Sequence, residues 1–229
     1  MISAYTQQVL EVFQLHDDQS KAGPMAKYMK DKFSYFGINS PTRKEISKTL
    51  LTRQLIPQIS DMPVIAKELW NQPQREVQYF TLDLLSKYSR KAPSGWIDLY
   101  EELITTKSWW DTVDGLAANQ VGMHFQRYPE LIKKYTNSWM VSGNIWLQRT
   151  CLIFQLRYKD QTDFEMLKSF IVPLASSNEF FLRKAIGWAL RQYGKFNPAA
   201  VIDFVESQPM SNLSKNEALR LINLSTWRF

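Results

Sequence analysis

Apolar side chains recur every three to four residues along most of the chain, the spacing that places them on one face of an α-helix. Alternating apolar and polar runs, which are typical of half-buried strands, are absent, and no Asn-Gly or Asp-Gly pair stands between two such runs. The pattern therefore predicts an all-α protein. Helices are expected over roughly 3–15, 23–35, 41–54, 63–71, 74–90, 94–106, 109–126, 129–139, 144–158, 163–174, 179–195, 198–206 and 214–224.

The helices of the middle and C-terminal parts follow a loose period. A helix with polar or aromatic residues at its start recurs near residues 74, 109, 144 and 179, and a shorter helix follows each of them. A period of about 35 residues is typical of stacked helix pairs, although the letters themselves do not repeat. We expect a single domain over residues 1–229, folded as a curved α-solenoid with a concave face. A compact, non-repeating helical bundle is the alternative.

Composition narrows the range of functions. Lysine and arginine number 28 against 22 acidic residues, so the net charge is +6 and the pI is near 9.3, which permits a polyanionic partner without requiring one. Cys151 is the only cysteine, and His16 and His124 are the only histidines, so neither a disulfide framework nor a cysteine- or histidine-rich metal site is expected. We therefore expect no metal and no cofactor, and a buried thiol at Cys151.

Targeting signals are also absent from the pattern. The N-terminal residues MISAYTQQVLEVF lack a basic segment followed by an apolar one, and no uncharged stretch is long enough to cross a membrane. These features favour a cytoplasmic protein with no membrane partner.

The segment KSWWDTVDGLAA, residues 107–118, crowds two tryptophans and two aspartates together. At about 100° per residue, Trp109 falls on the apolar stripe, whereas Trp110 and Asp114 share a face at its margin. Ser108 and Asp111 fit a capping box, as do Ser214 and Glu217 near the end of the chain. Asp114 is left without an evident structural role, although a plain surface or salt-bridge aspartate fits the pattern equally well.

Arg149 stands in the middle of an apolar stripe of the helix that contains NIWLQRTCLIFQLRYK. A buried guanidinium must find acceptors, because an unpaired buried charge is costly. One interpretation is a core arginine paired with a carboxylate or a helix end. The other is an arginine at the floor of a cleft that offers its planar fork to a phosphate.

Four residues of EFFLRKAIGWALRQYGK fall on one ridge of a helix: Lys184, Trp188, Arg191 and Lys195. Lysine stems that cover an indole explain this arrangement structurally. A ridge that binds a polyanion and offers an aromatic platform explains it functionally. Tyr28 stands among three lysines in a weaker version of the same pattern.

If successive helices line one concave face, Trp110, Asp114, Arg149 and Trp188 converge on a basic groove. Motifs for a phosphate-binding loop, a serine nucleophile or zinc chemistry are absent. A lone carboxylate among aromatic rings suits the stabilisation of a developing sugar cation, or the positioning of a water that attacks it. No acid is needed when the leaving group is already cationic, as an N-alkylated purine is, and indole faces attract such a cation.

The segments PMAKYMKDKFSYFGINSPTRK, KSWWDTVD, NIWLQR and FFLRKAIGWALR closely resemble those of AlkD-type DNA alkylation-repair glycosylases, the HEAT-like repeat DNA glycosylases. The resemblance covers about residues 5–222. It implies a HEAT-like repeat fold and a monofunctional glycosylase that removes cationic alkylpurines, such as 3-methyladenine and 7-methylguanine, from duplex DNA. It also implies that the lesion is not extruded into a pocket, unlike in base-flipping enzymes.

Matched position by position, the resemblance implies that Asp114 is the catalytic carboxylate and that Trp110 and Trp188 contact the lesion nucleotide, with Tyr28 beside them. Arg149 would hold a backbone phosphate. We add Lys184, Arg191 and Lys195 as further backbone contacts, and expect a monomer associated with bacterial DNA. Two alternatives stay open: a non-catalytic module that binds damaged or branched DNA, and a protein-interaction scaffold, a common role of helical repeats.

Overall fold

A computed structural model describes residues 2–222 of the chain. The described residues form helices and no strand, and one isolated bridge joins Ser34 to Gln74. Contacts between Cα atoms divide the chain into two compact units, and the division falls between Leu99 and Tyr100, inside one helix. The predicted all-α class and the helical-repeat architecture are confirmed.

The first unit begins with α1 (Ala4–Gln14) and α2 (Gln19–Tyr28), and continues with α3 (Ser40–Leu50), α4 (Met62–Trp70) and α5 (Arg75–Ser86); α6 (Trp96–Thr105) crosses the division. Glu76 of α5 accepts hydrogen bonds from the backbone N–H groups of three consecutive residues, Phe36, Gly37 and Ile38, at 2.9–3.1 Å. This buried carboxylate therefore fixes the segment that follows α2 onto α5.

The second unit contains α7 (Trp110–Gly115), a π-helix (Leu116–Val121) and α8 (Gly122–Arg127) in one continuous run, followed by α9 (Glu130–Val141) and α10 (Ile145–Ile153). A 3₁₀ turn (Lys159–Gln161) then leads to α11 (Phe164–Leu174), α12 (Phe180–Tyr193), α13 (Pro198–Ser207) and α14 (Asn212–Leu219).

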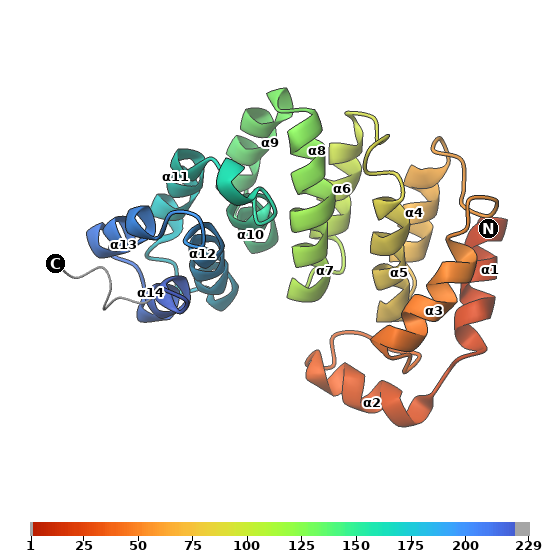
Figure 1. The fold of residues 1–229 in the computed structure, drawn as a ribbon. Helices are drawn as coiled ribbons and strands as arrows, with labels where there is room; N and C mark the ends of the chain where they lie inside the picture. Colours follow the sequence, from red (N-terminus) through yellow and green to blue (C-terminus); the bar gives the residue numbers. More distant parts are fainter. Residues whose placement is uncertain (1, 223–229) are drawn as a thin grey trace. The chain divides into compact units, whose positions relative to one another are not determined.

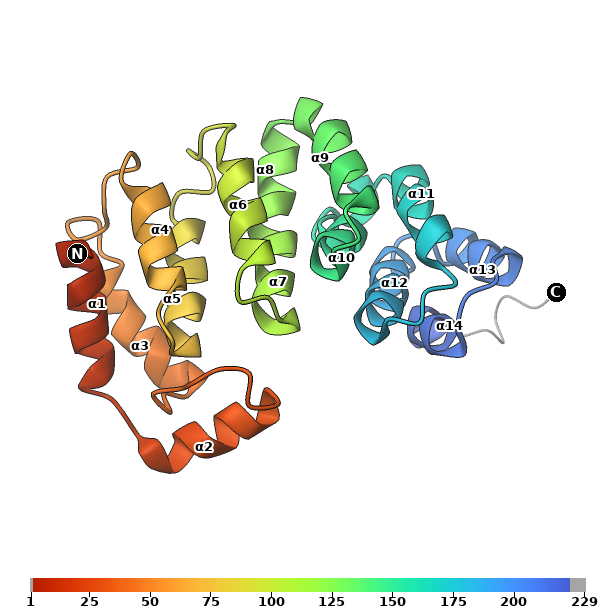
Figure 2. The same ribbon diagram turned by 180° about the vertical axis from the view of Figure 1, so that it is seen from behind.

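The predicted period is confirmed by the helix starts. Helices α5, α7, α10 and α12 begin at residues 75, 110, 145 and 180, each 35 residues after the last. Within the second unit, α7 contacts α10, α10 contacts α12, and α12 contacts α14, so these helices form one row. Figures 1 and 2 both show α12 and α14 side by side. Residues that are 35 apart in the sequence therefore occupy the same position in successive helices of this row, α7, α10 and α12.

Several predicted helix ends are wrong. The helix expected at 23–35 begins earlier and ends at Tyr28, because Asp18 caps it and the chain turns at Lys30 and Asp31, whose φ angles are positive. The helix expected at 214–224 begins at Asn212, where the side chain of Ser211 accepts the N–H of Ser214; residues 223 and 224 lie outside the described part of the chain.

The core agrees with the apolar pattern. Cys151 is fully buried, as predicted, and burial raises the pKa of its thiol. The described helices include none that is long and apolar enough to cross a bilayer. Residues 2–222 also hold no cluster of three or more histidine, cysteine or acidic side chains that suits a metal ion.

Candidate functional site

Trp109 and Trp110 are adjacent residues at the start of α7. Trp109 precedes the helix with an extended backbone, and its ring packs against Phe181 at 5.0 Å and Trp146 at 5.7 Å between centroids. The apolar pattern predicts a core residue, but Trp109 is half-buried. Its ring packs where α7, α10 and α12 begin. Trp110 is also half-buried, as the first residue of α7.

The predicted capping box at Ser108 is wrong. The helix begins one residue later than that motif requires, and the Ser108 hydroxyl donates to the carbonyl of Ile104 at 2.6 Å. Asp111 nevertheless lies in the first turn of α7, where the positive end of the helix dipole favours a carboxylate.

A π-helical segment, Leu116–Val121, follows Asp114 almost directly. Single π turns inside α-helices are often found at functional sites. The run is held where Gly122 meets α10: a Cβ at Gly122 would lie 2.5 Å from the carbonyl oxygen of Phe154, and the Tyr158 hydroxyl donates to the Gly122 carbonyl at 2.7 Å. This close approach fixes the helix that carries Asp114 against α10.

Asp114 and Arg149 form a two-point ion pair between α7 and α10. Nε of Arg149 donates to one carboxylate oxygen at 2.7 Å, and Nη2 donates to the other at 2.8 Å. The Arg149 side chain is 5% exposed and that of Asp114 is 18% exposed. The carboxylate therefore has one fixed orientation, and a part of it remains open to solvent.

The environment of Asp114 raises the pKa of its carboxyl group. Burial is the main cause, the two hydrogen bonds and the charge of Arg149 oppose it, and the negative charge of Asp111 adds to it. Burial outweighs the arginine because the carboxylate loses most of its contact with water. A carboxylate in this state is a stronger base than an ordinary surface aspartate.

Arg149 also bonds to α12. Its Nη1 donates to the backbone carbonyl of Phe181. The first interpretation of this arginine, a core guanidinium paired with a carboxylate, is therefore the one that the structure bears out. A guanidinium has five N–H donors, so these three bonds leave two for another acceptor.

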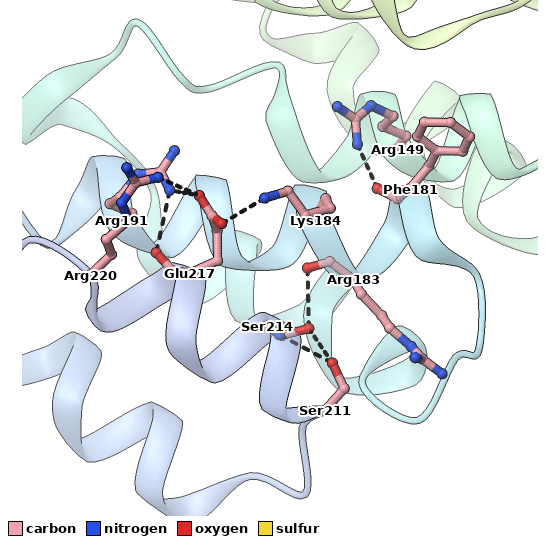
Figure 3. Close-up of polar contacts among 9 residues, drawn as sticks. All are labelled: Arg149, Phe181, Arg183, Lys184, Arg191, Ser211, Ser214, Glu217 and Arg220. Atoms are coloured by element: carbon pink, nitrogen blue, oxygen red, sulfur yellow. Dashed lines mark hydrogen bonds and ion pairs between the residues drawn. The ribbon is translucent and has the colours of Figure 1, made fainter. Parts of the chain in front are cut away.

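A row of charged residues crosses the second unit at equivalent positions of neighbouring helices. Asp114, Arg149 and Lys184 are the fifth residues of α7, α10 and α12, and Glu217 of α14 contacts Lys184. We call these four residues the charged row. Burial lowers the pKa of Lys184, and the positive charges of Arg191, Arg220 and Arg149 add to this effect. Figure 3 shows Lys184 directed toward Glu217 and Arg149 directed toward the carbonyl of Phe181.

Two residues of the predicted ridge on α12 bond to another helix, α14. Lys184 donates to Glu217 at 2.6 Å, and Arg191 pairs with the same carboxylate. Trp188 is half-buried and lies between these two cations along α12. Lys195 lies beyond the end of α12 and is exposed.

Tyr28 lies in the first unit, as the last residue of α2, with a 72% exposed side chain. Asp114, Arg149 and Trp188 all lie in the second unit. The structure brings Asp114 and Arg149 into direct contact and links Arg149 to α12.

Three contributors to this region were missed from the sequence. Trp146 and the carbonyl of Phe181 support the site through ring packing and a bond to Arg149. The sequence pattern places Glu217 in a capping box with Ser214. Its separation of 33 residues from Lys184 departs from the 35-residue period, so the pattern gives no signal for this pairing.

The arrangement defines a class of protein: a helical-repeat protein in which an arginine binds a half-buried carboxylate and further cationic side chains lie on the next helix. The sequence model of the DNA alkylation repair enzyme family matches residues 9–222, and the chain belongs to that family. Its fold is similar to that of a solved structure described as a predicted DNA alkylation repair enzyme from Enterococcus faecalis, at 28% identity and a TM-score of 0.84. The match covers 90% of this chain and 97% of that one. A comparison with curated proteins gave no match.

Proposed function

We propose that this member of the DNA alkylation repair enzymes is a monofunctional DNA glycosylase. It hydrolyses the N-glycosidic bond of cationic N-alkylpurines, of the 3-methyladenine and 7-methylguanine type, in duplex DNA, and so initiates base excision repair. We propose further that it acts as a monomer in the bacterial cytoplasm, at the DNA. The observation that carries the proposal is the two-point pair of Asp114 with Arg149 at a half-buried, partly open position.

Asp114 is the proposed catalytic residue. Its negative charge stabilises the positive charge that develops on deoxyribose as the base departs, either directly or through a water that it orients. Arg149 holds both carboxylate oxygens, so the carboxylate needs no reorganisation when the sugar charge develops. Each oxygen retains acceptor capacity for a water molecule, because a carboxylate oxygen has two acceptor positions.

The leaving group explains why one carboxylate is enough. An alkylated purine carries a positive charge and departs as a neutral base, so no proton has to be supplied. Trp110 lies one helical turn before Asp114, and we propose that its indole and that of Trp188 contact the lesion nucleotide. An indole face attracts a cation by roughly 0.5–2 kcal/mol, which favours a charged base over a neutral one.

Cationic side chains of the second unit are the proposed contacts to the DNA backbone. Arg149 has two N–H donors to spare for a phosphate near the lesion. Lys184 and Arg191 border Trp188, and Lys195 is exposed beyond them. We propose Tyr28, exposed at the end of α2, as a further contact to the lesion strand.

The experiment is a base-release assay with duplex DNA that carries 7-methylguanine or 3-methyladenine. The proposal predicts release well above the spontaneous rate, and no release of the neutral base uracil from an otherwise identical duplex. Release of uracil at a similar rate would contradict the role of the leaving group's charge. If the protein binds the duplex but no alkylated base is released, the chain is a non-catalytic binder of damaged DNA.

A further inference from the structure

The helix α14 approaches α12 unusually closely. A Cβ atom added at Gly187 would lie 2.5 Å from Cβ of Glu217 and 2.8 Å from the carbonyl oxygen of Ser214. Ser214 is fully buried, and its hydroxyl donates to the carbonyl of Arg183 at 3.1 Å. A residue without a side chain at position 187 thus lets the two backbones meet and fixes their register.

At that contact, one carboxylate bonds to two cations of α12. Glu217 accepts a hydrogen bond from Lys184 at 2.6 Å and pairs with Arg191, while Arg220 lies at 4.0 Å (Figure 3). The Glu217 side chain is only 12% exposed, whereas those of Lys184 and Arg191 are 37% and 17% exposed. The carboxylate therefore lies beneath the cations, which reach further toward solvent.

The charges around Glu217 do not cancel. Burial lowers the pKa of Lys184, and the positive charges of Arg191, Arg220 and Arg149 lower it further. Among the described residues, Glu217 and Asp114 are the carboxylates that pair with these cations, and Asp111 acts on Asp114. The four cations still outnumber these three carboxylates, and a phosphate of a polynucleotide would balance the excess of positive charge.

We propose that Glu217 is a positioning residue of the DNA-binding site: it holds Lys184 and Arg191 in fixed places on both sides of Trp188, so that their remaining N–H donors meet the DNA backbone. The choice of DNA as the anion rests on the proposed function. An ammonium has three donors and a guanidinium five, so both cations keep donors after bonding to Glu217. Ordering these long side chains before DNA arrives lowers the entropic cost of binding.

The sign of the effect distinguishes positioning from plain electrostatics. Glu217→Gln removes a negative charge, and long-range electrostatics alone then predicts tighter binding of DNA. The proposal predicts weaker binding, by about tenfold, because the two cations lose the carboxylate that fixes them, an effect similar to the loss of one charged hydrogen bond. Glu206→Gln, at an exposed position of α13, is the matched control and leaves the affinity unchanged or slightly higher.

The measurement is the affinity of the full chain for an unmodified duplex over a range of salt concentrations. For Glu217→Gln, the proposal also predicts a shallower dependence of affinity on salt, since fewer phosphates are neutralised. A role in stability alone would leave that slope unchanged in the folded protein. Unchanged or tighter binding by Glu217→Gln, with the wild-type slope, overturns the proposal.

A second variant keeps the test decisive if the glutamine variant does not fold. Glu217→Asp retains the charge but withdraws the carboxylate by one methylene. The proposal predicts that this variant binds DNA more weakly than the wild type and with a shallower salt dependence, both to a smaller extent than Glu217→Gln. A wild-type affinity together with a wild-type salt dependence would then count against the proposal. Binding of an unmodified duplex involves no excision, so these outcomes do not depend on whether alkylated bases are released.

Discussion

Arg149 contributes to the site in two ways, as the partner of Asp114 and as a link to α12. Lysine at this position keeps the charge but offers no planar fork, so it cannot bond to both carboxylate oxygens and to the carbonyl of Phe181. We expect Arg149→Lys to lower the free energy of unfolding by about 2 kcal/mol.

Thermal or denaturant unfolding monitored by circular dichroism measures this loss. Arg157→Lys, at an exposed position, is the control and is expected to change the unfolding free energy by less than about 0.5 kcal/mol. Equal stability of the two variants would show that the geometry of the pair contributes nothing to folding.

The raised pKa of Asp114 leads to a prediction about pH. In the proposed mechanism base release needs the ionised carboxylate, so the rate is expected to fall as pH decreases through the Asp114 pKa, which burial places above that of an ordinary aspartate. The charge of Asp111 also raises this pKa, so Asp111→Asn lowers it and moves the acid limb of the pH–rate profile to lower pH.

Single-turnover rates of the wild type and Asp111→Asn over a pH series measure this shift. Asp203→Asn, on the exposed part of α13, serves as the control and should reproduce the wild-type profile. A shift of the limb to higher pH in Asp111→Asn would contradict the electrostatic origin of the Asp114 pKa.

At the scale of single residues, the sequence indicated which side chains were out of place but not their partners. Arg149 in an apolar stripe had to be paired, and the structure supplies Asp114. The partner of Lys184 was missed, because the sequence places Glu217 in a capping box with Ser214, whereas Ser211 caps α14 and Glu217 bonds to Lys184.

Helix α12 shows how an element depends on one small residue. Gly187 lies inside the helix, where glycine is normally unfavourable, yet a methyl group there would collide with Glu217 and Ser214. We expect Gly187→Ala to destabilise the fold by about 1–3 kcal/mol through overpacking, despite the better helix propensity of alanine.

Gly23 provides a matched comparison. It lies inside α2, and a Cβ there would meet nothing within 4 Å, so Gly23→Ala is expected to stabilise the protein by up to about 1 kcal/mol. Thermal unfolding of both variants measures the difference. Equal changes in the two melting temperatures would mean that the contact between α12 and α14 tolerates a methyl group.

At the scale of elements, periodicity predicted the existence and order of the helices well, since the repeat starts at 75, 110, 145 and 180 follow the predicted spacing. The ends of the helices were harder to predict, because residues outside the expected motifs occupy the capping positions. Ser211 rather than Ser214 caps α14. The N-cap position of α7 is Trp109, whose side chain makes no capping hydrogen bond. The π-helix after Asp114 has no counterpart in the apolar pattern.

At the scale of the whole molecule, a net charge of +6 agrees with a partner that carries many negative charges. If the chain binds the DNA backbone through several cations, its affinity for duplex DNA falls steeply as salt increases, with a slope of about −0.9 per phosphate contacted. Fluorescence anisotropy with an unmodified duplex measures the slope. An affinity that is independent of salt would contradict a DNA-binding role and favour a protein-interaction scaffold.

The central claim is that Asp114 performs the chemistry. The most direct test is the single-turnover rate of 7-methylguanine release at saturating enzyme, for the wild type and for Asp114→Asn, with Asp203→Asn as the control. Loss of the carboxylate charge is predicted to lower the rate by about 10²-fold or more while DNA binding is retained, because a preorganised charge is removed from the transition state. An Asp114→Asn rate within a few-fold of the wild type would contradict the account.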